Sequence, residues 1–282
     1  MSKWKKYLIG ELSWKRLAKS LISIYVILLV IAVSLADYFI FLPPTPTYTE
    51  QSDHIALIEG SEANTKIATY YRPAKPGMAT LLWSHGNAED LSSTSFLDLF
   101  HQAGFGIYAY DYPGYGLSDG SPSDRSCYAA IERVYVDLTL THKIASKDLI
   151  LVGKSVGSGP TTYLATQKPA AGMILINPLS SIYRVAFRFP IFPRDRFPNI
   201  DRIKGITTPL MVIHGEEDGV IPQSHGKALI AAHTGKHIFH DLKGRGHNDI
   251  YGDSPEEIQA FIQLFLDFSQ TLSAETISTS KK

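Results

Sequence analysis

The sequence contains a single cysteine, Cys127, among its 282 residues. One thiol excludes an intramolecular disulfide and any metal site built mainly from cysteine. The formal net charge is zero, so the composition gives no indication of nucleic-acid binding. His233, His237 and His240 lie close together in the chain, but Gly235 interrupts the helix that the first two would have to share. We therefore expect no metal and no cofactor.

Long hydrophobic runs are also absent, with one exception near the N-terminus. Residues 21–42 (LISIYVILLVIAVSLADYFIFL) contain one charged residue, Asp37, and match the ~20 residues of a membrane-spanning helix. Six basic residues precede this run, and the first basic residue after it is Lys66. The pattern predicts a single-pass transmembrane anchor with a cytoplasmic N-terminus. It places the rest of the chain on the extracytoplasmic side, which in a bacterium is the periplasmic face of the inner membrane.

A cleaved signal peptide is the alternative interpretation of this N-terminus. Ser34-Leu35-Ala36 resembles a small-x-small cleavage site, but the basic leader is long and the apolar run resumes at Tyr38. The expected organisation has five segments. They are a basic leader over 1–20, the anchor over 21–42, a proline-rich linker over 43–52, a globular domain over 53–272 and a disordered tail over 273–282.

Short apolar runs alternate with helix-length segments through the globular domain. The runs typical of strands occupy residues 54–58, 66–71, 80–83, 106–110, 149–152, 172–176, 210–213 and 237–241. Helical patterns occupy 93–102, 125–143, 161–167 and 225–233, and a last one begins with the capping box at Ser254. This alternation predicts an α/β fold with a mostly parallel central sheet and helices on both faces. The first two strands have no helix between them and are expected to form an antiparallel edge.

Residues 148–160 (DLILVGKSVGSGP) carry the main local motif. Gly153-Lys154-Ser155 could end a phosphate-binding loop, but the first glycine of that motif would fall at Asp148, and an apolar run fills the place of the loop. Gly153-x-Ser155-x-Gly157 matches instead a nucleophile elbow, in which a serine stands at the tip of a sharp turn between a strand and a helix. The sequence therefore predicts Ser155 as a nucleophile.

The partners of Ser155 are sought at the carboxyl ends of other strands, because active residues of open α/β sheets gather there. Asp218 follows the strand at 210–213, and His247 follows the last strand in a glycine-containing loop. The order Ser155, Asp218, His247 is the nucleophile, acid and base order of α/β-hydrolases. For the oxyanion hole we expect the backbone N–H groups of Asn87, in the loop after 80–83, and of Val156, directly after the nucleophile.

Five stretches carry a resemblance to a known family: SHGNAED, DYPGYGLSDGSPS, GKSVGSGP, FPNIDRIKGITTPLMVIHGEEDGVIP and GRGHNDI. They resemble the Bem46-like α/β-hydrolases, a group that includes the ABHD13- and ABHD17-type enzymes, over most of residues 50–270. The resemblance implies the α/β-hydrolase fold and a triad of Ser155, Asp218 and His247. The chain departs from the family at Lys154, where a neutral residue such as Gln is expected. It also lacks the N-terminal cysteine cluster of the family's depalmitoylases.

These features predict a membrane-anchored serine hydrolase that cleaves an ester or thioester of a small-molecule or acylated substrate, without nucleic acid as a partner. A peptidase or amidase using the same triad is one alternative, and a non-catalytic membrane-anchored binding protein is another. The apolar stretch 186–193 is expected either to form a wall for an acyl chain or a bilayer-facing surface, or to pack over the sheet. The sequence leaves the oligomeric state open.

Overall fold

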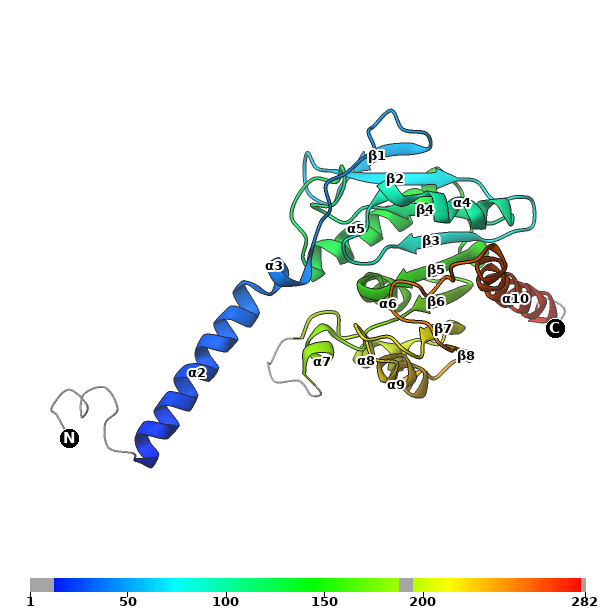
Figure 1. Ribbon diagram of the computed structural model, residues 1–282. Helices are drawn as coiled ribbons and strands as arrows, with labels where there is room; N and C mark the ends of the chain where they lie inside the picture. The colour runs from blue at the N-terminus through cyan, green and yellow to red at the C-terminus, as the bar shows by residue number, and fades with distance from the viewer. Residues whose placement is uncertain (1–12, 188–194, 280–282) are drawn as a thin grey trace.

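The computed structural model describes residues 13–187 and 195–279, and its centre is a single eight-stranded sheet (Figure 1). The strand order is β1-β2-β4-β3-β5-β6-β7-β8. Strand β2 pairs antiparallel with β1, as expected for this edge, and it also pairs antiparallel with β4. The remaining neighbours are parallel. The strands are β1 Ile55–Glu59, β2 Lys66–Arg72, β3 Thr80–Ser84, β4 Gly106–Tyr110, β5 Leu149–Lys154, β6 Gly172–Ile176, β7 Leu210–Gly215 and β8 His237–Leu242.

Helices cover both faces of the sheet, and each face has its own hydrophobic core. The helices are α4 Ser95–Gln102, α5 Asp124–Val136, α6 Ser158–Gln167, α7 Ile182–Ala186, α8 Asn199–Arg202, α9 Ser224–Ala232 and α10 Pro255–Thr279. Phe100 of α4 and Phe265 of α10 pack on one face, whereas Ile131 of α5 and Leu164 of α6 pack on the other. The inner strands β3 to β7 are buried along their whole length. Burial on both faces explains why they read as continuous apolar runs.

Two helical predictions differ from the structure. The helix expected over 125–143 ends as α5 at Val136 and continues as one π-helical turn, η2 (Asp137–Thr141). Helix α10 extends to Thr279, through most of the segment 273–282 that was expected to lack regular structure. Phe268 and Leu272, in the part of α10 before this segment, are buried.

The predicted transmembrane helix is wrong. In the part of the chain that the structure describes, no helix combines the length and the apolarity needed to cross a membrane. The run 21–42 is divided between α2 (Trp14–Ser34), which begins among basic residues, and the short helix α3 (Ala36–Ile40). Its end is folded onto the domain, since Ala36 and Phe41 are buried. The predicted single-pass topology, with an extracytoplasmic domain, depended on this span and is not supported.

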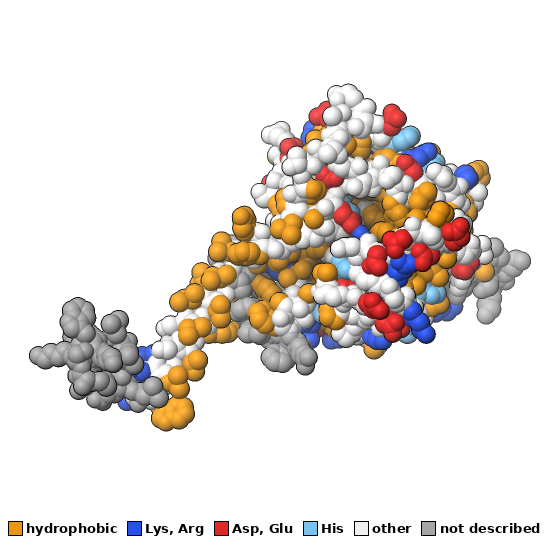
Figure 2. Space-filling model, in the orientation of Figure 1, with side chains coloured by type: hydrophobic (Ala, Val, Ile, Leu, Met, Phe, Trp, Pro, Cys, Tyr) orange, Lys and Arg blue, Asp and Glu red, His pale blue; other side chains and the backbone are white. Residues whose placement is uncertain are grey.

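Helix α2 extends away from the domain, and hydrophobic side chains are exposed along it (Figures 1 and 2). The proline-rich segment that follows α3 lies against the globular domain. Thr47 N–H donates to Ser92 Oγ over 2.8 Å, and the buried Tyr48 hydroxyl bonds to the Asp111 carboxylate. Residues 43–52 are therefore an extended strap packed on the domain.

Candidate active site

Ser155 stands at the turn between β5 and α6 in a strained backbone conformation. Its φ is 52°, in the left-handed region that costs a non-glycine residue about 1–3 kcal/mol. A Cβ on Gly153 would lie 2.6 Å from Gly157 O, and a Cβ on Gly157 would lie 2.2 Å from Ser84 O of the neighbouring strand β3. Both glycines are thus required by close backbone approach. The turn has the geometry of a nucleophile elbow.

The side chains of Ser155, His247 and Asp218 meet at the carboxyl ends of β5, β7 and β8. His247 Nε2 lies 2.9 Å from Ser155 Oγ, and His247 Nδ1 lies 2.7 Å from Asp218 Oδ2. Because Nδ1–H donates to the carboxylate, the Nε2 lone pair faces the serine hydroxyl. This arrangement can remove a proton from Ser155 and hold the resulting positive charge next to Asp218.

Asp218 is held by several donors in a buried position. Val220 N–H and Ile221 N–H donate to Oδ1 over 2.9 and 2.7 Å, and His214 Nε2 lies 3.5 Å from Oδ2. Burial alone would raise the pKa of Asp218, but hydrogen bonds from His214, His247 and the Ile221 backbone hold this pKa well below its ordinary value. The carboxylate is therefore ionised across the physiological range and fixed in orientation.

The two residues expected to supply oxyanion donors, Asn87 and Val156, line the same cleft as Ser155 and His247. Val156 follows the nucleophile in the short helix η4 (Ser155–Gly157). Asn87 belongs to the loop 85–90 between β3 and η1 (Leu91–Ser93), and the next residue, Ala88, has a φ of 56°. Two backbone N–H groups on separate elements beside a serine can stabilise negative charge on an attacked carbonyl oxygen.

Lys154, the departure from the family pattern, connects the elbow to this loop. Its ammonium forms a salt bridge with Glu89 and lies 4.9 Å from the centre of the Tyr251 ring. Glu89 Oε2 accepts a hydrogen bond of 2.9 Å from Gly86 N–H. Burial opposes ionisation of Glu89, but Lys154 and Gly86 N–H hold the pKa of Glu89 below its ordinary value. The buried ion pair therefore fixes the loop beside Ser155.

Sequence reasoning missed two other supports of the site. Asn177 follows β6, and its side chain accepts from Gly215 N–H over 3.0 Å and donates to His247 O over 3.1 Å. His214, the other missed residue, supports Asp218 from within β7. The signal for Asn177 was its place directly after a buried strand, next to the nucleophile strand. The carboxylates Glu216 and Glu217, beside Asp218 in the same turn, are exposed.

A cleft of about 460 Å³ opens over the triad. Its walls are mainly apolar and come from α7, through Ile182 and Val185, and from the N-terminal segment, through Phe39 and Leu42. Of the predicted apolar stretch 186–193, Ala186 lines this cleft, whereas residues 188–193 lie outside the described residues. The cleft can accept an apolar group next to the serine hydroxyl.

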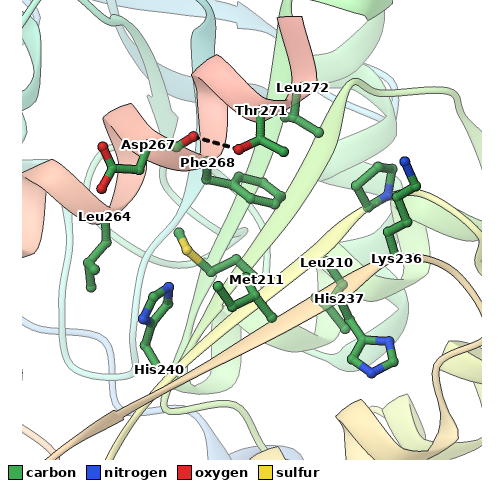
Figure 3. Close-up of a pocket in the computed structure, with 12 residues that line it drawn as sticks. Leu210, Met211, Lys236, His237, His240, Leu264, Asp267, Phe268, Thr271 and Leu272 are labelled. Atoms are coloured by element: carbon green, nitrogen blue, oxygen red, sulfur yellow. Dashed lines mark hydrogen bonds between the residues drawn. The ribbon is translucent and has the colours of Figure 1, made fainter. Parts of the chain in front are cut away.

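A second cavity, of about 270 Å³, lies between β8 and α10 (Figure 3). Met211 and His240 line it from the sheet, and Leu264 and Phe268 line it from α10. Leu210 and His237, which also line it, are the first residues of their strands. The cavity is therefore at the rim opposite to the triad and does not belong to the catalytic cleft.

Comparisons with known proteins agree with this arrangement. Residues 76–192, which include the elbow and the loop of Asn87, match the family model described as serine aminopeptidase, S33. Human α/β-hydrolase domain-containing protein 17B is 35% identical over 260 residues, covering 81% of this chain and 90% of that protein. Mouse α/β-hydrolase domain-containing protein 17C is 39% identical over 199 residues, covering 68% and 62%. The chain belongs to the ABHD17-type α/β-hydrolase family.

The fold of this family member is also shared with more distant solved structures. Mouse α/β-hydrolase domain-containing protein 10 superposes with a TM-score of 0.59 at 15% identity, covering 77% of this chain and 99% of that chain. Similarity at this level shows the fold alone. Family and fold together support an enzyme of the α/β-hydrolase type.

Proposed function

We propose that the protein is a serine hydrolase that transfers the acyl group of an ester or thioester to water through an acyl-enzyme. The observation that carries this proposal is the hydrogen-bonded series from Ser155 through His247 to Asp218, with distances of 2.9 and 2.7 Å. An imidazole in contact with both a strained serine and a buried carboxylate is the arrangement that activates a serine nucleophile.

The reaction follows from this geometry in two halves. Ser155 Oγ attacks the carbonyl carbon while His247 Nε2 accepts its proton, and Asp218 stabilises the imidazolium. The Asn87 and Val156 N–H groups stabilise the oxyanion, and His247 then protonates the departing alcohol or thiol. In the second half His247 accepts a proton from the water that attacks the acyl-enzyme carbonyl, and it returns this proton to Ser155 Oγ as the acid departs.

The apolar walls of the cleft support an acylated substrate or a small ester as the molecule that is cleaved. Amide cleavage is a second candidate, because the family model that matches residues 76–192 is described as a serine aminopeptidase. The triad chemistry is the same for both, so the leaving group decides between them. A purely binding role is disfavoured, since binding alone does not require the Ser155–His247–Asp218 contacts.

Labelling with a fluorophosphonate probe tests the nucleophile. Ser155→Ala should abolish labelling and lower hydrolysis of p-nitrophenyl acetate by at least about 10³-fold, since it removes the attacking atom. Ser180→Ala is the matched control, because Ser180 Oγ also contacts an imidazole, 2.8 Å from His225 Nδ1. Labelling that persists in Ser155→Ala and disappears in Ser180→Ala would contradict the assignment. Parallel assays with p-nitroanilides and with p-nitrophenyl esters of increasing acyl length separate amidase from esterase activity.

A further inference from the structure

The end of the N-terminal helical segment is hydrogen-bonded to the oxyanion loop. Asn87 Nδ2 donates to Ile40 O over 2.6 Å, and Leu42 N–H donates to Asn87 Oδ1 over 3.0 Å. The side-chain amide of Asn87 thus forms two hydrogen bonds with the backbone of residues 40–42. Asn87 is 47 positions from Ile40 and 45 positions from Leu42 in the chain. The same Oδ1 accepts from Ala88 N–H over 3.1 Å.

The hydroxyl of Tyr115 bridges the Asn87 side chain and the Leu42 backbone. The Tyr115 hydroxyl donates to Asn87 Oδ1 over 2.6 Å and accepts from Leu42 N–H over 2.9 Å. Leu42 N–H is therefore shared between two acceptors, both on the globular domain. Tyr115 itself is fully buried, so its ring cannot move without disturbing the core.

Packing and charge hold the N-terminal segment at this place. Phe41 is 4% exposed, and its ring centre lies 6.4 Å from that of Tyr115 and 6.1 Å from that of Phe197. Asp37 Oδ1 lies 3.4 Å from the guanidinium of the buried Arg196. Residues 37–42 are therefore held against the globular domain.

We propose that residues 36–42 position the oxyanion loop for catalysis, an inference that rests on the proposed function. The Asn87 N–H must point at the oxyanion before the reaction, because a donor that has to reorganise contributes less. The Asn87 side chain and the left-handed Ala88 define the loop backbone, and the only segment bonded through both Nδ2 and Oδ1 of that side chain in the described residues is 40–42. The Asn87 side chain, Tyr115 and Leu42 have a positioning role, since they act through the loop, whereas the Asn87 N–H is the proposed oxyanion donor.

The Leu42 N–H can be removed without touching the loop. Leu42→Pro deletes this donor and extends the existing run Pro43-Pro44, and Phe41 already has the extended conformation (φ −99°, ψ 127°) that precedes proline. Leu42→Ala is the matched control, because it loses the same side chain and keeps the N–H. For p-nitrophenyl acetate, which has the shortest acyl group of the ester series, Leu42→Pro should lower kcat about tenfold relative to Leu42→Ala, with KM within about twofold.

A second pair of variants distinguishes a specific loss of positioning from a general loss of folding. Tyr115→Phe removes the bridging hydroxyl and keeps the ring, and Tyr135→Phe removes a comparable hydroxyl that donates to Pro169 O over 2.9 Å, away from the cleft. Only Tyr115→Phe should lower kcat. Hydrogen–deuterium exchange of the peptide covering residues 84–91 in the full chain should be faster in Leu42→Pro and Tyr115→Phe than in their controls, whether or not substrate is turned over.

The outcomes separate this inference from the proposed function. If the wild-type protein hydrolyses the ester and Leu42→Pro retains the kcat of Leu42→Ala, the positioning role is overturned and the serine hydrolase remains. If the wild-type protein neither labels nor hydrolyses, the proposed function fails, and the catalytic role of the segment fails with it. A kcat loss confined to Leu42→Pro and Tyr115→Phe, with faster exchange in the loop, supports the positioning role.

Discussion

The residue next to the nucleophile carries an ion pair where the family pattern leads one to expect a neutral side chain. The side chain of Lys154 is 7% exposed, and that of its partner Glu89 is 34% exposed. Removing one member of a buried pair leaves the other charge without compensation, which makes such variants destabilising even where the pair itself contributes little. The pair of Lys154 and Glu89 should therefore be visible in measurements of stability.

Lys154→Met should lower the free energy of unfolding by about 2 kcal/mol. This is less than the 3–5 kcal/mol of a fully buried pair, because water still reaches Glu89. Urea unfolding of Lys154→Met, Glu89→Gln and the double variant gives the coupling energy, which should be about 1–2 kcal/mol. The exposed pair Lys204 and Asp201 is the control, with expected coupling below about 1 kcal/mol. Equal coupling in both pairs would show that Lys154 does not brace the loop.

Among single residues, the sequence predicts the catalytic side chains better than the side chains that hold them in place. Ser155 and Asp218 could be identified because each follows a buried strand, and His247 because it follows the last strand in a loop with two glycines. Most side-chain contacts of Asn87 and Asn177 could not be identified, because partners such as Leu42 N–H and His247 O are backbone groups distant in sequence. A backbone partner leaves no residue type that a pattern could detect.

Among the helices and strands, α10 is a case in which a local sequence motif, the capping box, determines where the helix begins. Glu257 Oε2 accepts from Asp253 N–H and Ser254 N–H over 2.9 and 3.1 Å, and Ser254 Oγ accepts from Glu257 N–H over 3.2 Å. This is the capping box expected from the sequence. The backbone N–H groups of Asp253 and Ser254, with the guanidinium of Arg245, lower the pKa of Glu257 to about 2. Arg245 lies two residues before His247, so the cap also ties the histidine loop to α10.

Ser254→Ala should lower the free energy of unfolding by about 1 kcal/mol, because one N–H at the start of α10 loses its acceptor. Thermal unfolding checks this, with Ser123→Ala at the start of α5 as a second cap that predicts a loss of similar size. The contribution of Glu257 is present above its ordinary pKa and is lost as the pH falls toward 2, so the Ser254 effect should be measured at neutral pH. An unchanged melting temperature in Ser254→Ala would mean that packing alone sets the start of α10.

The N-terminal elements show the opposite case, in which a strong local pattern predicts the wrong structure. The hydropathy of 21–42 is uniform, but tertiary contacts divide it. Phe41 enters the core, and Asp37 pairs with Arg196, a residue 159 positions away. A window along the sequence cannot detect these contacts, because it averages residues that fold into different environments. The same limitation hid the strap formed by residues 43–52.

For the whole molecule, alternation predicted the α/β architecture and the antiparallel edge but not the order of the strands. The chain places β4 between β2 and β3, so that β3 lies beside β5 and the loop of Asn87 reaches the elbow. The hydrophobic patterns of β3 and β4 do not specify that β4, and not β3, lies beside β2. This order follows from the crossover connections through α4 and α5, which must cover opposite faces of the sheet. The site could be predicted because any such order brings carboxyl ends to one rim.

The strap of residues 43–52 contacts a buried acid, Asp111, and this acid should make the free energy of unfolding depend on pH. Asp111 is fully buried at the end of β4, where Tyr48 of the strap and Leu91 N–H bond to it. Burial is the main cause that raises the pKa of Asp111 from 3.8 to about 7. The folded protein therefore holds a proton that the unfolded chain releases between pH 4 and pH 7. Its free energy of unfolding should fall by about 1.4 kcal/mol per pH unit over that window from this group.

Asp111→Asn should remove this dependence, because the amide does not ionise; its oxygen can still accept one of the two hydrogen bonds, from Leu91 N–H or from the Tyr48 hydroxyl. Urea unfolding at pH 5, 6, 7 and 8 should show the variant gaining stability relative to the wild type up to about pH 7, by roughly 3 kcal/mol in total, and no further gain above it. Asp98→Asn is the control of opposite sign. Hydrogen bonds from Tyr70 and Arg72 lower the pKa of Asp98 despite its partial burial. Asp98→Asn should therefore show a constant disadvantage from pH 5 to 8 and lose it only below about pH 4. A constant difference between Asp111→Asn and the wild type from pH 5 to 8 would mean that Asp111 is ionised in the folded protein, and that the strap is held by a charged Tyr48–Asp111 hydrogen bond.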